Sequence, residues 1–209
     1  MYIPPSFLET DVGKLHDFIE HHSFATLITN QDGEPFASHL PLLLDRNSGH
    51  SGRLIGHMAR ANSQWKSAAD QMSLAIFHGP HAYISPGWMD SQNVVPTWNY
   101  VAVHAYGTLR LIEERDEVLK IVSQTVERYE SRREQPWRIE LPDPSFIDKL
   151  LGAIVGFEIV VDRLEGKWKL NQNHPDERRA KIVQGLRETD SPDEVQIADL
   201  MEQVKPARS

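Results

Sequence analysis

The alternation of apolar and polar positions in the first third of the chain predicts three β-strands. Residues 24–29 and 35–45 have this pattern, and the segment between them contains Asp32-Gly33, a pair that favours a tight hairpin turn. A polar, glycine-containing loop then leads to a third strand at residues 53–58. The pattern therefore predicts a hairpin followed by a further strand.

Strand signal returns later in the chain, where β-branched and aromatic residues gather. The later strands are expected at residues 73–77, 81–84, 98–112 and 154–164. Gly79-Pro80 separates the first two of these and predicts a turn there. Because the strands come mostly in adjacent pairs, the order favours an antiparallel barrel with peripheral helices over a doubly wound parallel sheet.

Helical periodicity lies between and after these strands. Helices are expected at residues 10–22, 62–69, 113–132 and 146–151, and two more close the chain after Pro175 and Ser191. In the first helix Val12, Leu15, Phe18 and Ile19 form one apolar stripe.

Side chains that favour helix starts precede three of these segments. Thr10 and Asn62 are expected N-caps, and Ser191-Pro192-Asp193-Glu194 has the form of a capping box with proline at the first helical position.

Length and composition are those of an ordinary globular protein. The chain has 209 residues, and no stretch approaches the ~20 apolar residues of a membrane span. With no cysteine, disulfides and thiolate chemistry are excluded, and the cytoplasm is the expected location.

The net charge of -8 argues against broad attraction to DNA, although direct contact stays open. The nearest basic cluster is Arg178, Arg179, Lys181 and Arg187, which is better interpreted as a solvated helix face.

Five segments place polar and aromatic residues where a plain barrel would not need them. They are His39-Leu40-Pro41, Gly56-His57-Met58-Ala59-Arg60-Ala61-Asn62, Gly79-Pro80-His81-Ala82-Tyr83-Ile84-Ser85-Pro86-Gly87-Trp88, Val95-Pro96-Thr97-Trp98-Asn99-Tyr100 and Leu164-Glu165-Gly166-Lys167-Trp168-Lys169-Leu170-Asn171-Gln172-Asn173. In this order they resemble the motifs of the FMN-binding negative transcriptional regulators of the PaiB type, from about residue 1 to residue 186. Two positions depart from the family pattern: Asn171 replaces the usual serine, and Met89 replaces an aromatic residue.

The resemblance implies a mainly β protein with helices, the FMN-binding split barrel shared with pyridoxamine phosphate oxidases. It implies a homodimer with two flavin sites between the subunits. We expect a split-barrel domain at residues 1–170 and a C-terminal helical extension at 171–209.

The same residues can be interpreted without the family, from the chemistry of a flavin mononucleotide. Its phosphate needs cationic donors, and Arg60 lies where a helix is expected to start, with His57 or Asn62 to assist. Lys167 and Lys169 alternate around Trp168, so both ammonium groups face one side of a strand. An exposed arginine beside a helix cap and a lysine-protected edge strand are the plain alternatives.

Other candidates are assigned to the ring and the mouth of the site. Trp98 and Asn99 are expected to line the flavin ring or a substrate, Gln172 to bond the pyrimidine edge, and Ser85 to lie in a rigid loop at the pocket mouth. His39 belongs to the first motif. Each also has an ordinary structural interpretation, as a core, interface or turn residue.

Other classes of protein are compared with this interpretation. An FMN-dependent oxidoreductase of the pyridoxamine phosphate oxidase or flavin reductase kind is the main rival. A haem-binding split barrel is a lesser one, with His39, His57 and His104 on or near strands. No metal site is expected, because His78 and His81 lack a third ligand at suitable spacing, and no hydrolase elbow or dinucleotide fingerprint is present.

Overall fold

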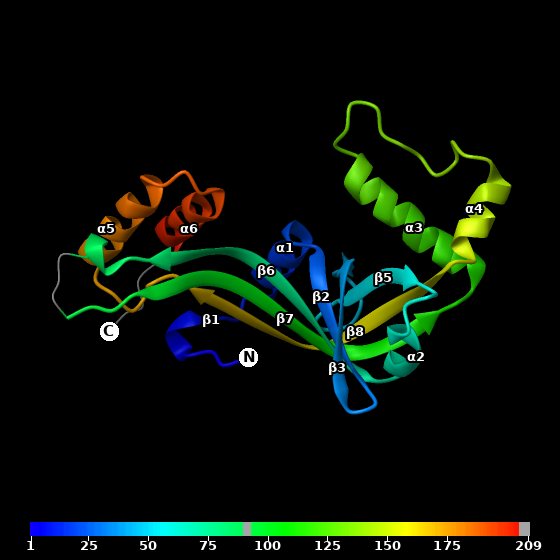
Figure 1. Ribbon diagram of the computed structural model, residues 1–209, viewed down its shortest axis with the longest axis horizontal. Helices are drawn as coiled ribbons and strands as arrows, with labels where there is room; N and C mark the ends of the chain where they lie inside the picture. The colour runs from blue at the N-terminus through cyan, green and yellow to red at the C-terminus, as the bar shows by residue number, and fades with distance from the viewer. Residues whose placement is uncertain (90–92, 205–209) are drawn as a thin grey trace. The chain divides into compact units, whose positions relative to one another are not determined.

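The computed structural model describes residues 1–89 and 93–204, which form an antiparallel sheet with helices around it (Figure 1). The strands are β1 (Leu8–Glu9), β2 (Phe24–Gln31), β3 (Glu34–Pro41), β4 (Leu43–Asp45), β5 (Arg53–Ala59), β6 (Met72–Ile84), β7 (Thr97–Ile112) and β8 (Ile154–Lys169). Their order in the sheet is β3-β2-β6-β7-β8-β5-β4, and β1 pairs with β8. The expected fold class, antiparallel β with peripheral helices, is confirmed.

Six α-helices accompany the sheet in the described residues. They are α1 (Val12–His21), α2 (Gln64–Ala68), α3 (Arg115–Glu130), α4 (Pro144–Leu151), α5 (Asp176–Arg187) and α6 (Pro192–Gln203), with short 3-10 turns at Pro5–Phe7 and Pro86–Trp88. None of the helices in the described part of the chain is long and apolar enough to cross a membrane.

The chain divides into two compact units. Unit 1 comprises residues 1–18, 78–104 and 165–209, and unit 2 comprises residues 19–77 and 105–164. The C-terminal helices α5 and α6 pack on each other in unit 1, and Figure 1 shows them side by side. The expected boundary at residue 170 stays a prediction.

The first hairpin forms as its sequence predicts. β2 and β3 pair antiparallel up to Gln31 and Glu34, and the two residues between them have the positive φ angles of 54° for Asp32 and 91° for Gly33. Such angles suit the two-residue hairpin turn, whose twist matches that of the flanking strands. The inward side of β2 carries Ala25 and Leu27, both fully buried.

Helix α3 covers strands of unit 2 through two apolar side chains. Val118 and Ile121 are buried, and a Cβ placed on Gly156 of β8 would lie 2.9 Å from Ile121 Cδ1. The glycine therefore lets the helix approach the strand closely. On the neighbouring strand Leu54 and Met58 complete this core.

The predicted turn at Gly79-Pro80 was wrong, because β6 is one continuous strand. Pairing between β2 and β6 covers only Leu74 to Ile76, so the later part of β6 has no β2 partner for its amides to bond. A proline, which lacks an amide hydrogen, is tolerated at such a position. Gly79 is needed for space, since a Cβ there would lie 2.7 Å from the ring of Phe18.

One expected helix cap was also wrong. Helix α1 begins at Val12, and the carboxylate of Asp11, rather than Thr10, accepts a hydrogen bond from the amide of Lys14 at 3.2 Å. Val12 is 37% exposed and lies outside the apolar stripe, whose other members are buried. Ser191 precedes α6 as expected but makes no side-chain cap bond.

Candidate functional site

The ten residues predicted to bind the flavin divide between the two units. Unit 2 contains His39, His57, Arg60 and Asn62, and unit 1 contains Ser85, Trp98, Asn99, Lys167, Lys169 and Gln172. Each unit therefore has its own set of candidate groups, and the two sets are described separately.

In unit 2 the loop that carries Arg60 is fixed by side-chain hydrogen bonds. Asn62 donates to Ser38 Oγ at 2.9 Å and accepts from the amide of Gln64 at 3.0 Å, while Trp65 Nε1 donates to the carbonyl of Arg60 at 3.0 Å. The predicted N-cap, Asn62, therefore lies one residue before the N-cap position, which Ser63 occupies, but its side chain still accepts from the first helical amide. Both the nitrogen and the oxygen of its side-chain amide bond within the protein.

The guanidinium of Arg60 keeps much of its bonding capacity. It stacks over the Trp65 ring at 5.6 Å from the centroid, and its ion pair with Glu113 measures 3.2 Å between side chains that are 39% and 56% exposed. An exposed pair of this kind contributes little, so an anion could replace Glu113 at small cost. Arg60 is therefore held in place and available.

The two predicted histidines of unit 2 differ in environment. His39 is exposed on β3, where Nδ1 lies 3.1 Å from Thr26 Oγ1 and the ring stacks on Phe24. His57 is half-buried on β5, and this burial lowers the pKa of its imidazole. His57 is therefore neutral at pH 7.

The same strands present an exposed face, which we call the open sheet face. Residues directly opposite each other across an antiparallel pair point to the same side. The pairing registers of β2 with β3 and β6 place these side chains on that face: Phe24, Thr26, Ile28, Ala37, His39, Leu74 and Ile76, with Met72 two residues before Leu74 on β6. Phe24 is 66% exposed and Met72 is 59% exposed. The opposite side of β2 is buried, so only this face is open.

In unit 1 the two lysines on β8 have different surroundings. Lys167 is buried, donates to the carbonyl of Tyr2 at 3.1 Å, and lies 5.0 Å from the ring centroid of Tyr100. Lys169 donates to Thr97 Oγ1 at 2.5 Å and to the carbonyl of Trp98. Burial, together with the charge of Lys167, lowers the pKa of Lys169.

Trp98 is the most open of the remaining candidates, 53% exposed, with its ring centroid 5.9 Å from that of Tyr83. It lines a cavity of about 560 Å³ with His78, His81, Tyr100 and His104 among its other walls. This cavity has the aromatic lining expected of a site for a flat ring.

Three other predicted residues bond within the protein. Asn99 is fully buried and donates to Met201 Sδ at 3.3 Å. Gln172 is buried, with its amide nitrogen donating to the carbonyl of Trp168 at 2.5 Å and its oxygen accepting from the amide of Leu170 at 2.8 Å. Ser85 Oγ accepts from the amide of Gly87 at 3.2 Å. All three have structural roles that account for their polar groups.

A second cavity of unit 1 contains residues that the sequence did not single out. Its volume is about 370 Å³, and its polar lining includes Lys169, Asn171, His174 and Arg178. Asn171 has a positive φ of 59° and begins the turn between β8 and α5. This turn brings Asn171, His174 and Arg178 back toward Lys169. Their grouping therefore depends on backbone geometry that sequence spacing does not reveal.

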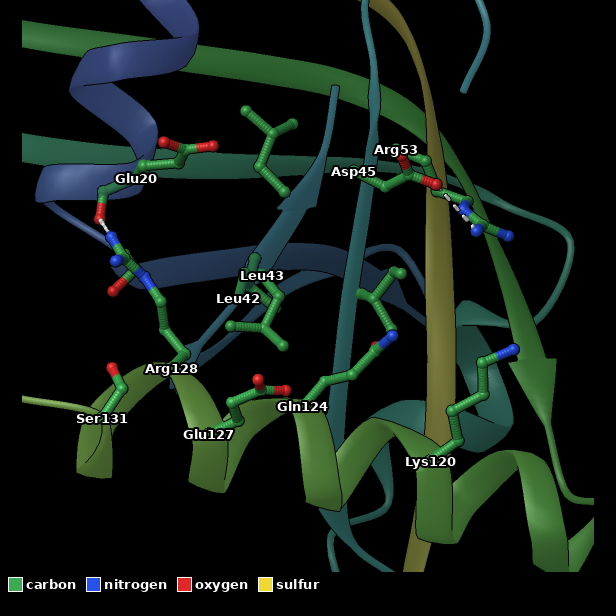
Figure 2. Close-up of a pocket in the computed structure, with 13 residues that line it drawn as sticks. Glu20, Leu42, Leu43, Asp45, Arg53, Lys120, Gln124, Glu127, Arg128 and Ser131 are labelled. Atoms are coloured by element: carbon green, nitrogen blue, oxygen red, sulfur yellow. Dashed lines mark hydrogen bonds and ion pairs between the residues drawn. The ribbon is translucent and has the colours of Figure 1, made fainter. Parts of the chain in front are cut away.

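The groove in Figure 2 lies in unit 2 and contains none of the ten predicted residues. It has a volume of about 720 Å³ between α3 and the segment of Leu42 to Asp45. Its arginines are already bonded: Arg128 donates to the carbonyl of Glu20 at 2.8 Å, and Arg53 pairs with Asp45 at 3.0 Å. These two arginines are therefore less available to bind an anion than the composition of the groove suggests.

The basic cluster of the C-terminal segment does not form an open cationic surface. Arg179 is buried and donates to the carbonyls of Met201 and Val204. Arg187 pairs with Asp199 at 2.7 Å and Glu202 at 2.9 Å. The interpretation of Arg179 as part of a solvated face was wrong, because this side chain ties α5 to the end of α6.

Among the described residues, no group of three or more histidine, aspartate or glutamate side chains is placed to hold a metal ion. Unit 2 carries an exposed cation on Arg60. Unit 1 carries the exposed Trp98 ring and an unpaired buried amide oxygen on Asn171.

Two solved structures share the fold of this chain over most of its length. The fold matches a FAD- and haem-binding protein of Mycobacterium smegmatis with a TM-score of 0.60 at 16% identity, covering 85% of this chain and 80% of that one. It also matches the flavocytochrome Anf3 of Azotobacter vinelandii with a TM-score of 0.59 at 15% identity, covering 83% and 74%. At such low identities the likeness concerns the fold alone.

Sequence comparison is more specific. Residues 1–163 match the family model described as "Putative FMN-binding domain". The chain is also 37% identical over 203 residues to the protease synthase and sporulation protein PAI 2 of Bacillus subtilis, covering 97% of each protein. The chain belongs to this FMN-binding family, and the resemblance found in its motifs is confirmed.

Proposed function

We propose that this chain is a homodimeric, FMN-binding regulator of the PaiB type, with each flavin held between two subunits. The open sheet face of unit 2 is the observation that carries the proposal. It combines large exposed apolar side chains with His39, one of the predicted flavin residues.

A second copy of the chain is the partner that we assign to this face. Exposed apolar surface of this kind marks interaction sites, and a stable dimer buries about 1,600 Å² in total. Phe24 and Met72 would form the apolar centre of the contact. Its polar positions, Thr26 and His39, bond each other through Thr26 Oγ1 and His39 Nδ1.

The flavin phosphate is assigned to Arg60, whose charge has only an exposed acidic partner. The isoalloxazine ring is assigned to the aromatic and cationic groups of unit 1, where Trp98 and Lys169 line separate cavities. FMN would supply reversible electron transfer, while these side chains bind it, orient it and exclude water.

Regulation through the bound flavin agrees with the charge of the chain better than direct contact with DNA does. The net charge is -8, and three of the basic residues of α5, Arg179, Lys181 and Arg187, are bonded to acidic or backbone partners. We therefore propose that redox state or a small effector is the signal, in the cytoplasm. An FMN-dependent oxidoreductase would differ by turning over a nicotinamide cofactor with a specific acceptor.

The test combines FMN titration with measurement of oligomeric state. Wild type should bind FMN as a dimer, and Met72→Glu should give a folded monomer with at least tenfold weaker FMN binding, because the charge would be desolvated in the contact. Leu141→Glu is the control, since Leu141 is 69% exposed outside the open sheet face. A Met72→Glu variant that stays dimeric, or a monomer with full FMN affinity, would overturn the intersubunit site.

A further inference from the structure

The cavity beside Asn171 groups nitrogen donors in an unusual way. Lys169, His174 and Arg178 all line it, and none of its described lining residues carries a carboxylate. The first turn of α5 contains Asp176 and Glu177, but these are 78% and 85% exposed and pair with Arg179 and Lys181. The described lining therefore has a positive charge without a counter-ion.

The three nitrogen groups retain donors for a ligand. Lys169 uses two of its three hydrogens on Thr97 and Trp98. Nη1 of Arg178 lies 3.1 Å from Nδ1 of His174, so the guanidinium keeps its other N–H groups and the imidazole keeps a proton on Nε2. These donors would suit one negatively charged acceptor group.

The cavity also has an acceptor. Asn171 is only 3% exposed, and its Oδ1 atom is buried without a hydrogen-bond partner. A buried amide oxygen without a partner is unfavourable, so its presence favours a ligand that brings an N–H or O–H group. The matching ligand therefore has an anionic edge with a hydrogen-bond donor directly beside it.

The remaining walls suit a flat heterocycle. Phe7, Met89, Val94 and Val95 provide apolar surface around the polar cluster. A site with apolar walls and a few convergent polar groups is typical of ring-shaped cofactors. A free oxyanion would not need these walls.

We infer that this cavity binds the pyrimidine edge of the flavin and prefers its reduced, anionic form. The inference rests on the proposed flavin binding. Two-electron reduction with uptake of one proton places that proton on N5 and leaves a negative charge shared by N1 and O2, next to the N3–H donor. Lys169, His174 and Arg178 would hold that negatively charged edge, and Asn171 Oδ1 would accept from N3–H.

The electrostatics of the cluster agree with this assignment. Burial is the main cause of the lowered pKa values of Lys169 and His174, and the charges of nearby cations add to it. An anion in the cavity would relieve this repulsion. The neutral oxidised ring would relieve it less, which is why the two redox states are distinguished.

The experiment measures the midpoint potential of bound FMN by spectroscopic titration with dithionite. Arg178→Gln removes the charge and keeps amide donors, and it should lose at least tenfold of the preference for reduced flavin. This loss is a shift of ~30 mV to more negative potential for a two-electron couple. Asn171→Asp, which keeps the size and the tolerance of positive φ, should shift the potential in the same direction.

Arg187→Gln is the matched control, because Arg187 lies on the same helix but pairs with Asp199 and Glu202. Its potential should equal that of wild type. Unchanged potentials in both Arg178→Gln and Asn171→Asp, with FMN bound, would overturn this inference alone. Failure of wild type to bind FMN would overturn the proposed function and this inference with it.

Discussion

Nη1 of Arg178 lies 3.1 Å from Nδ1 of His174, one helical turn earlier in the chain. A guanidinium has no acceptor, so His174 accepts this bond and is held as the neutral tautomer with its proton on Nε2. The pKa of His174 is lowered by burial first, then by Arg178 and Lys169. The arginine therefore sets both the charge and the orientation of the imidazole.

Arg178→Gln should raise the pKa of His174 toward its ordinary value of 6.5, because a positive neighbour is removed while burial remains. NMR titration of the imidazole in the flavin-free protein measures this directly. Arg187→Gln should leave the pKa of His174 unchanged. A His174 pKa that does not rise in Arg178→Gln would show that Arg178 does not contribute to lowering it.

Arg60→Ala should weaken FMN binding at least tenfold, as expected from loss of a charge-assisted hydrogen bond of ~1.5 kcal/mol or more. Flavin fluorescence during titration gives the affinity. Arg115→Ala is a suitable control, because Arg115 is also an exposed arginine of unit 2 and bonds Asp148 and Asp116. Equal FMN affinities of Arg60→Ala and wild type would remove Arg60 from the phosphate site.

The sequence predicted elements whose signals are local. Asp32-Gly33 specifies its turn through backbone angles that few residues adopt, and the hairpin forms there. The signal at Gly79-Pro80 failed because it depends on what lies beside it. β2 pairs with β6 only up to Ile76, and Phe18 occupies the space that a side chain at position 79 would need.

The sequence also predicted only part of the candidate site. Motifs identified residues such as Arg60 and Lys169, which remain predictions as flavin ligands. They did not show that Gln172 bonds its own turn, or that Asn171 has the unpaired oxygen. These distinctions depend on side-chain direction at the end of β8, which sequence pattern alone does not specify.

Gly185→Ala should destabilise the protein by about 1–3 kcal/mol through overpacking. A Cβ at this position of α5 would lie 2.4 Å from Cδ2 of Trp88, a rigid ring that cannot simply rotate away. Urea unfolding measures the effect. Gly152→Ala should change the free energy of unfolding by less than about 0.5 kcal/mol, since its Cβ would meet only backbone oxygens at 3.5 Å or more. Equal stabilities of the two variants would contradict the close contact.

His104 should make the protein less stable in mild acid. Burial, then the charges of the Met1 ammonium and of His78, lower the pKa of His104 from 6.5 to about 4. The His104 imidazole therefore takes up a proton near pH 6.5 in the unfolded state, but only near pH 4 in the folded state. The contribution of neutral His104 to stability is fully present above pH 6.5 and is lost as the pH falls through this window.

His104→Gln removes the titration and should flatten this part of the stability profile relative to wild type, whereas His50→Gln, at an exposed position, should follow wild type. Parallel profiles for wild type and His104→Gln between pH 6.5 and 4 would rule out a depressed pKa at His104.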